Sequence, residues 1–264
     1  MKELILRTLT GIILIALVFG SILLGPVSLS AVLLLIYLLG VKELFGLLSK
    51  RGLSIHWFRA IPGALLLITT YTVFEYQLSL IWLLLPPALW LLSALRGGIT
   101  LSGTLAFLWL AIPFSSILAL GWALDEPGFQ SRLPFYLIAL VWINDTFAYL
   151  TGSLLGRHKM TPVLSPGKTW EGFTGGVLIT LLSGWLIWYY NGLAARWIWL
   201  LISLLVSLLG LAGDLFESGL KRTVKVKNSG DLLPGHGGIL DRFDSLLFVA
   251  PAVLILFILL KLVQ

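Results

Sequence analysis

The sequence has 264 residues, of which 58% are hydrophobic and only 11% are charged, and its formal net charge is +6 at pH 7. Soluble domains carry roughly a quarter charged residues, so this composition excludes an ordinary water-soluble protein. The Leu-rich blocks do not alternate as the strands of a transmembrane barrel do, and they indicate an all-α, polytopic integral membrane protein. There is no cysteine, which excludes disulfides, thiolate metal ligands and cysteine nucleophiles.

Apolar runs of about 20 residues are long enough to cross a bilayer as helices. In chain order we expect nine spans, at residues 5–24, 27–48, 58–75, 78–96, 101–122, 133–155, 172–191, 196–220 and 239–262. The third and fourth are the least clearly separated, because little more than Glu75 and Gln77 interrupts the apolar sequence between them. No small-residue cleavage site follows the first span, so we expect it to remain as a membrane anchor.

The distribution of basic residues tests this span count, because cytoplasmic loops carry an excess of lysine and arginine. With nine spans, 14 of the 18 basic residues fall on the side of the N-terminus, three fall on the other side and Lys42 lies within the second span. We therefore predict that the N-terminus and the long polar loops after the sixth and eighth spans are cytoplasmic. The protein would then lie in the cell membrane, that is, a plasma or inner membrane.

Polar residues divide the chain into two regions. Residues 1–130 hold five spans that contribute hydrophobicity and little else, and the fourth and fifth spans offer a surface for a homodimer. Residues 131–264 hold four spans and the polar chemistry, because seven of the 12 acidic residues lie between positions 144 and 244. Ionisable residues within apolar spans are costly in lipid and are therefore candidates for a functional site.

Asp145 lies in the middle of the sixth predicted span. We expect its carboxyl group to face a polar cavity and to take part in substrate binding. The alternative is a protonated structural aspartate that is hydrogen-bonded to Asn144 or Thr146. Small residues follow at intervals of four and favour close packing against another helix; they are Ala148, Gly152 and Gly156.

The loop before the seventh span contains the sequence SPGKTWEG at residues 165–172. Gly-Lys-Thr is also part of a P-loop, but the upstream glycine is absent and no strand is expected before it, which excludes a Walker fold. Lys168 is suited to binding a triphosphate, and Ser165 and Glu171 are candidates for contact with substrate. For Glu171 the alternative is simple capping of the helix that follows.

The segment from Gly213 to Asp244 carries the largest group of charged residues. On the eighth span, acidic and basic residues share one helix face, namely Asp214, Glu217, Ser218 and Lys221. Asp241 and Asp244 follow at the start of the ninth span. Carboxylates on two neighbouring helices are suitable ligands for a hard divalent cation such as Mg²⁺. The alternative is a set of structural salt bridges with Lys221, Arg222 and Arg242.

Directly before the ninth span stands the sequence PGHGG at residues 234–238. A glycine-rich turn that enters a helix exposes backbone N–H groups and is suited to holding phosphate. Gly237 and Gly238 are therefore candidates for substrate binding, although they could equally form only a tight turn. His236 is a candidate for catalysis, and the alternative is a histidine that forms a hydrogen bond within the loop.

These segments together resemble the phosphatidate cytidylyltransferase family, also called CDP-diacylglycerol synthases. The family pattern is S-x-φ-K-R-x4-K-D-x-[GSA]-x2-[LF]-[PG]-x-H-G-G-φ-x-D-R-φ-D, where φ is apolar, and residues 218–244 match it in register. The SPxKTWEG and DTFAY segments also resemble the family, so the resemblance covers roughly residues 140–250. One position departs from the pattern, because Asn228 stands in the place of an aspartate, and it is left out of the metal set.

The resemblance implies a nucleotidyltransferase of phospholipid biosynthesis that condenses CTP with phosphatidic acid to CDP-diacylglycerol and pyrophosphate. It implies a requirement for Mg²⁺, with a second cation as an option in the same carboxylate cluster; the implied metal ligands are Asp214, Asp241 and Asp244. The implied catalytic residues are Lys168, Lys221, Arg222 and His236. The implied substrate-binding residues are Asp145, Ser165, Glu171, Ser218, Gly237, Gly238 and Arg242. The expected partners are CTP, phosphatidic acid and membrane lipid, without nucleic acid.

Other classes of membrane protein explain these residues less well. A transporter or channel also uses buried acids and basic rims, but it does not require lysines, carboxylates and a PGHGG turn on one face. A CDP-alcohol phosphatidyltransferase requires the run D-G-x2-A-R-x8-G-x3-D-x3-D, which is absent. A membrane scaffold requires no such cluster.

Overall fold

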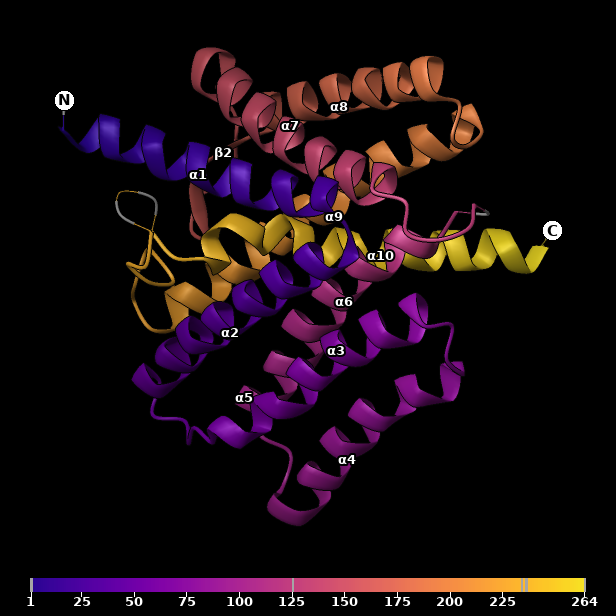
Figure 1. Ribbon diagram of the computed structural model, residues 1–264. Helices are drawn as coiled ribbons and strands as arrows, with labels where there is room; N and C mark the ends of the chain where they lie inside the picture. The colour runs from indigo at the N-terminus through magenta and orange to yellow at the C-terminus, as the bar shows by residue number, and fades with distance from the viewer. Residues whose placement is uncertain (1, 125, 234, 236, 264) are drawn as a thin grey trace.

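The apolar runs of the sequence form helices, because a helix satisfies its backbone N–H and C=O groups within its own segment. The computed structural model describes residues 2–124, 126–233, 235 and 237–263 (Figure 1). The N-terminal helices are α1 (Lys2–Leu24), α2 (Pro26–Lys50), α3 (Ile61–Glu75), α4 (Leu85–Gly97), α5 (Leu101–Thr104) and α6 (Ile112–Ala119). The C-terminal helices are α7 (Arg132–Leu155), α8 (Trp170–Asn191), α9 (Arg196–Thr223) and α10 (Leu240–Val263). Short helical turns extend or join them: η1 (Trp57–Ala60), η2 (Leu80–Leu84), η3 (Leu105–Ala111) and η4 (Leu120–Trp122).

Seven helical segments of the described chain are long and apolar enough to cross a membrane. They are Pro26–Lys50, Trp57–Glu75, Leu101–Trp122, Arg132–Leu155, Trp170–Asn191, Arg196–Thr223 and Leu240–Leu262. The first and fourth predicted spans correspond to the shorter apolar helices Thr8–Leu24 and Leu80–Arg96. The helices thus fit an all-α membrane protein, whereas the count of nine crossings stays a prediction.

The connections between helices gather at two ends of the bundle. Toward the end that holds the N-terminus lie the turn after α2, the connection from α7 to α8 and the loop from α9 to α10 (Figure 1). Toward the opposite end lie the C-terminus and the connection from α8 to α9 (Figure 1). The two long polar loops that the sequence places on one side therefore lie at the same end of the molecule.

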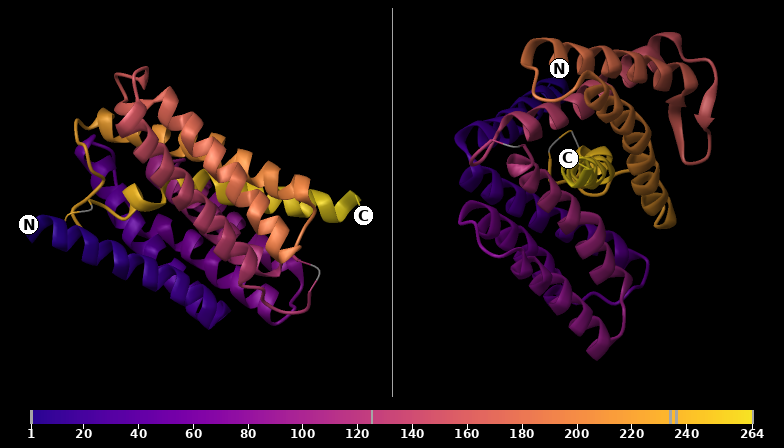
Figure 2. Two further views of the ribbon diagram at one scale, coloured as in Figure 1. Left: turned by 90° about the horizontal axis from the view of Figure 1, so that it is seen from above. Right: turned by 90° about the vertical axis from the view of Figure 1, so that its right-hand side faces the viewer.

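Helix α10 lies at the centre of the bundle. It contacts α9 and α7 on one side and α6, α2 and η3 on the other, and Figure 2 shows it end-on among these helices. Its inward-facing side chains are almost completely buried, among them Phe243, Leu246, Val249 and Val253. The position of α10 therefore depends on helices from both regions of the sequence.

Small residues bring α7 and α8 close together, as the sequence predicts. A Cβ atom added to Gly172 of α8 would lie 2.6 Å from the backbone oxygen of Ala148 and 3.0 Å from the Cα atom of Gly152, both on α7. A Cβ atom added to Gly152 would lie 3.0 Å from Thr169 Oγ1. The two backbones can approach this closely only because these positions lack bulky side chains.

A two-stranded hairpin connects α7 to α8, so the expectation of no strand in this loop is wrong. Strands β1 (Lys159–Thr161) and β2 (Ser165–Thr169) are antiparallel, with Lys159 opposite Thr169 and Thr161 opposite Ser165. Strands this short carry too few residues for their alternation to be read from the sequence. The SPGKTWEG segment thus consists of strand β2, at residues 165–169, and the start of α8, at residues 170–172.

Candidate active site

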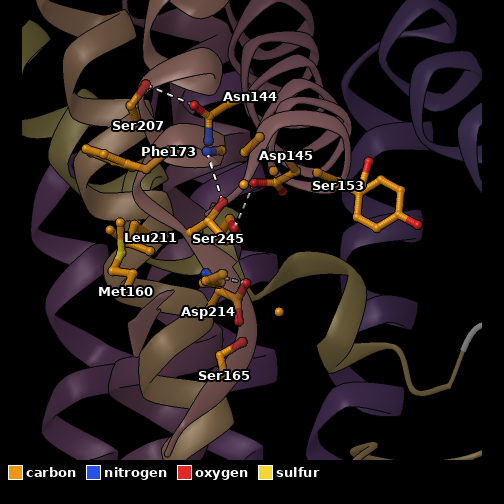
Figure 3. A pocket seen from close by; sticks show the side chains of 18 of the residues that line it. Asn144, Asp145, Ser153, Met160, Ser165, Phe173, Ser207, Leu211, Asp214 and Ser245 are labelled. Carbon is orange, nitrogen blue, oxygen red and sulfur yellow. Dashed lines mark hydrogen bonds and ion pairs between the residues drawn. The ribbon is translucent and has the colours of Figure 1, made fainter. Parts of the chain in front are cut away.

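The polar residues of the C-terminal helices surround one cavity of about 630 Å³. Its walls come from α7, the hairpin, α8, α9 and α10 (Figure 3). Seven of the predicted site residues line it, namely Asp145, Ser165, Lys168, Asp214, Asp241, Arg242 and Asp244. Residues separated by up to about a hundred positions in the sequence thus face the same space.

Lys168 and Asp214 form an ion pair across the cavity wall. The Nζ atom of Lys168, on β2, lies 2.5 Å from Oδ2 of Asp214, on α9, and both side chains are partly exposed. The hydroxyl group of Ser218 donates a hydrogen bond of 3.2 Å to the other oxygen, Oδ1. The pair therefore holds the hairpin against α9 while it keeps a cation and an anion at the edge of the cavity.

Lys221 lies within ion-pair distance of two further acids, Asp241 at the cavity wall and the buried Glu217. Its Nζ atom lies 2.6 Å from Asp241 Oδ1 and 3.3 Å from Glu217 Oε1, and the Glu217 side chain is fully buried. The backbone N–H groups of Ser229 and Gly238 also donate to Asp241 Oδ2, at 3.1 and 2.8 Å. Because removal of one partner leaves a buried charge uncompensated, this network fixes the start of α10 against α9.

Asp145 and Asp244 approach the cavity from α7 and α10. The hydroxyl group of Ser245 donates to Asp145 Oδ1 at 3.4 Å, and the Ser245 N–H donates to Asp244 Oδ1 at 2.7 Å. In Figure 3 Ser245 lies between Asp145 and Asp214. Asp145, Asp214 and Asp244 all line this cavity, and their like negative charges therefore repel one another. A cation in the cavity would relieve this repulsion.

Asn144 joins three helices beside the cavity. Its Oδ1 atom accepts a hydrogen bond of 3.0 Å from Ser207 of α9 (Figure 3) and one of 3.3 Å from Thr180 of α8. All three side chains are buried. Sequence reasoning considered Asn144 only as a partner of Asp145 and missed this junction, whose partners lie 36 and 63 positions away in the chain.

Six predicted site residues lie in described parts of the chain but do not line the cavity: Glu171, Ser218, Lys221, Arg222, Gly237 and Gly238. Arg222 donates hydrogen bonds to the backbone oxygens of Leu164, at 3.4 Å, and Val226, at 3.0 Å. Gly237 has a φ of 82°, which favours glycine in a tight turn. His236 lies outside the described residues, so its predicted catalytic role stays a prediction.

Glu171 stabilises the turn that follows α7 through hydrogen bonds. Its carboxylate accepts hydrogen bonds from the N–H groups of Arg157, at 3.1 Å, and His158, at 3.2 Å, and lies 2.5 Å from His158 Nδ1. The capping residue of α8 is Thr169, whose hydroxyl group accepts a bond from the Gly172 N–H at 3.1 Å. Glu171 therefore has a different structural role from capping its own helix.

The cavity offers the kind of ligands that Mg²⁺ takes, without a closed cage. Among the described residues, no three Asp, Glu or His side chains are arranged to hold a metal ion by themselves. Mg²⁺ usually binds through one or two carboxylates, several waters and the phosphates of a substrate instead of an all-protein cage. The carboxylates of Asp145, Asp214 and Asp244 fit that mode of binding, because all three line the same cavity.

The chain matches the model of the cytidylyltransferase family over residues 5–260. It is 35% identical over 271 residues to the phosphatidate cytidylyltransferase of Staphylococcus epidermidis, with 96% of this chain and 98% of the relative covered. The phosphatidate cytidylyltransferase of Staphylococcus haemolyticus is 35% identical over 273 residues, with the same coverage of both chains. That of Staphylococcus aureus is 51% identical over 124 residues, which cover 47% of this chain and 48% of the relative. The similarity thus extends into the N-terminal helices, where the sequence offers no motif.

The role of Glu171 can be tested by Glu171→Gln. The amide side chain retains one acceptor oxygen for several donors, so the turn at residues 157–159 should open more often. Trypsin should therefore cut after Arg157 and Lys159 faster than in the unchanged protein in detergent, as followed by mass spectrometry. Glu75→Gln makes the same change at an exposed carboxylate and should leave the cleavage rate unaltered. Equal rates in all three proteins would contradict the assigned role.

Proposed function

Because the chain belongs to the cytidylyltransferase family, we propose that it condenses CTP with phosphatidic acid to CDP-diacylglycerol and pyrophosphate in phospholipid biosynthesis. The protein is a nucleotidyltransferase. The observation that carries the proposal is the cavity in which three repelling carboxylates face Lys168 and Arg242. Two relatives that match over nearly their full length are named phosphatidate cytidylyltransferases, which supports phosphatidic acid as the acceptor of the cytidylyl group.

The proposed reaction joins two phosphates and requires no protein nucleophile. An oxygen of the lipid phosphate attacks the α-phosphorus of CTP, the bond from that phosphorus to the bridging oxygen breaks, and pyrophosphate leaves. Because both reactants are anions, catalysis consists mainly of screening charge and aligning the attacking oxygen with the leaving group. Such stabilisation depends on charged groups that are already in place when substrate binds.

Three basic residues line the cavity, Lys159, Lys168 and Arg242, and of these we propose that Lys168 and Arg242 bind the phosphates. The Lys168 Nζ atom is held by a single carboxylate oxygen of Asp214, so it can exchange that oxygen for one of a phosphate without moving the backbone. Lys221 contributes differently, because it keeps Asp241 and Glu217 paired and holds α9 against α10. Ser218 orients Asp214 through its hydroxyl group.

The proposed Mg²⁺ ligands are Asp214 and Asp244, with Asp145 as the acid from the facing helix. These residues would hold Mg²⁺, which would supply positive charge to the triphosphate and to the leaving pyrophosphate. This set differs from the one inferred from the sequence, because Asp241 is already engaged by Lys221 and by two backbone N–H groups. We propose Asp145 in its place, since it lines the same cavity and its carboxyl group accepts a hydrogen bond from Ser245, the residue next to Asp244.

The end of the bundle that holds the N-terminus is proposed to face the cytoplasm, in a plasma or inner membrane. The α9–α10 loop and the hairpin lie at this end (Figure 1), and the excess of basic residues assigns it to the cytoplasmic side. CTP would then enter the cavity from water while the acyl chains of phosphatidic acid remain in the lipid.

The activity can be tested with purified protein in detergent, labelled CTP, phosphatidic acid and Mg²⁺. Labelled CDP-diacylglycerol should form and should disappear when Mg²⁺ is chelated. Asp244→Asn removes a charge from the cavity and should lower kcat about 100-fold or more, because it removes a group that acts on the transition state. Glu75→Gln should retain the normal rate. The absence of Mg²⁺-dependent product with the unchanged protein would refute the proposed function.

The orientation can be tested with single cysteines, because the natural chain has none. A membrane-impermeant maleimide should label Lys50→Cys and Lys225→Cys from the cytoplasmic side only, since both positions are exposed at the end that is proposed to be cytoplasmic. Ala195→Cys, exposed in the connection from α8 to α9, should react from the opposite side. Labelling of positions 50 and 225 from different sides would contradict the arrangement.

A further inference from the structure

A buried carboxylate in the N-terminal region reaches the loop that leads into α10. Glu43 lies on α2 and is 8% exposed, whereas its neighbour Lys42 is exposed on the other face of the helix. A charged group inside an apolar bundle is costly unless it is hydrogen-bonded. The position of Glu43 therefore requires partners, and those partners come from the far end of the sequence.

The donors that reach Glu43 are two backbone N–H groups and one hydroxyl group. The Ile239 N–H donates to Oε1 at 2.8 Å, and the Leu240 N–H donates to Oε2 at 3.0 Å. The Ser229 hydroxyl group donates to Oε2 at 2.9 Å. Both carboxylate oxygens are thus used, and together these bonds hold a point within the α9–α10 loop, at Ser229, and the junction of that loop with α10.

Glu43 also caps α10 from outside that helix. The first N–H groups of a helix have no partner within it, and the positive end of the helix dipole attracts negative charge. The Glu43 carboxylate accepts hydrogen bonds from the N–H groups of Ile239 and Leu240, and the Asp241 carboxylate accepts one from the Gly238 N–H at 2.8 Å. Two carboxylates from different helices therefore hold consecutive amides at the start of α10.

Two glycines of the loop make room for this carboxylate. A Cβ atom added to Gly230 would lie 2.8 Å from Glu43 Oε1, and one added to Gly238 would lie 2.8 Å from Glu43 Cδ. These separations are too short for side-chain atoms. Glycine at these two positions therefore allows the loop backbone to approach Glu43, and the Gly238 N–H is already bonded to Asp241.

We propose that Glu43 is a positioning residue for the transfer reaction, because it clamps the α9–α10 loop and the first turn of α10 to α2. It does not line the cavity, but Asp241, Arg242 and Asp244 of that first turn do. Through this clamp, the N-terminal helices set where these side chains point. The expected effect of Glu43 on the reaction rate rests on the proposed function. The contact between Glu43 and the loop rests on geometry alone.

The test compares Glu43→Gln with Glu43→Asp and with the control Glu75→Gln, all purified in detergent. In Glu43→Gln an NH₂ group replaces one acceptor oxygen and faces a donor, so at least one loop bond is lost. We expect kcat per folded molecule to fall about 10- to 100-fold, because small displacements of reacting groups have effects of this size. Glu43→Asp keeps the charge on a shorter stem and should retain more of the rate than Glu43→Gln.

Hydrogen–deuterium exchange supplies a readout that does not depend on activity. The amides of residues 229–240 should exchange faster in Glu43→Gln than in the unchanged protein and Glu75→Gln, since their hydrogen bonds open more often. Gly230→Ala is an independent variant that leaves Glu43 unchanged but displaces the loop from it. It should show both a lower kcat and faster exchange at residues 229–240. Gly46→Ala is its control, because an added Cβ at position 46 meets no atom within 4 Å.

The outcomes separate the two claims. If the unchanged protein forms no CDP-diacylglycerol, the proposed function fails, and the exchange data still decide whether Glu43 clamps the loop. A Glu43→Gln protein with normal kcat per folded molecule would overturn the positioning role, even if its melting temperature is lower. Unchanged exchange at residues 229–240 in both Glu43→Gln and Gly230→Ala would overturn the clamp itself.

Discussion

Charged side chains inside an apolar helix bundle must find partners, and the arrangement of this site depends on how they do so. Asp214 is paired with Lys168, Asp241 and Glu217 share Lys221, and Glu43 binds the amides at the start of α10. A buried charge that loses its partner costs about 3–5 kcal/mol, so the contacts of the buried Glu217 and Glu43 restrict how α2, α9 and α10 can move, whereas the partly exposed pair of Lys168 and Asp214 contributes less. Together they fix the hairpin, α2, α9 and α10 relative to one another at one end of the bundle.

The same pairing explains how a cavity without a metal cage can serve an anionic substrate. Asp145, Asp214 and Asp244 repel one another, and Lys168 compensates only one of them directly. A nucleotide that binds together with a cation would supply partners for both kinds of charge. The cation would bind the carboxylates, and the phosphates would bind Lys168. Binding of substrate and metal would therefore be coupled, as is usual where Mg²⁺ is held partly by the phosphates that it activates.

Local properties of the sequence predicted most of the fold and much of the cavity, and long-range contacts account for what was missed. The helices follow from apolar runs, and the close packing of α7 on α8 follows from Ala148 and Gly152. The hairpin was missed because its strands have only three and five residues. Glu43 was missed because its partners lie 186 to 197 positions away, and one acid beside Lys42 does not reveal which way it faces. For Asp241, the sequence offered Lys221 as a salt-bridge partner, whereas the N–H groups of Ser229 and Gly238 became its donors through the fold of the irregular loop, which residue types alone do not reveal.

The central claim is that the cavity binds CTP with a divalent cation, and that Asp214 then passes from Lys168 to the cation. The most direct measurement is an experimental structure of the protein with Mg²⁺ and a non-hydrolysable CTP analogue. We expect a triphosphate in the cavity, an ion bound to oxygens of Asp214 and Asp244, and Lys168 Nζ in contact with a phosphate. A nucleotide bound elsewhere, with the pair between Lys168 and Asp214 intact, would contradict it.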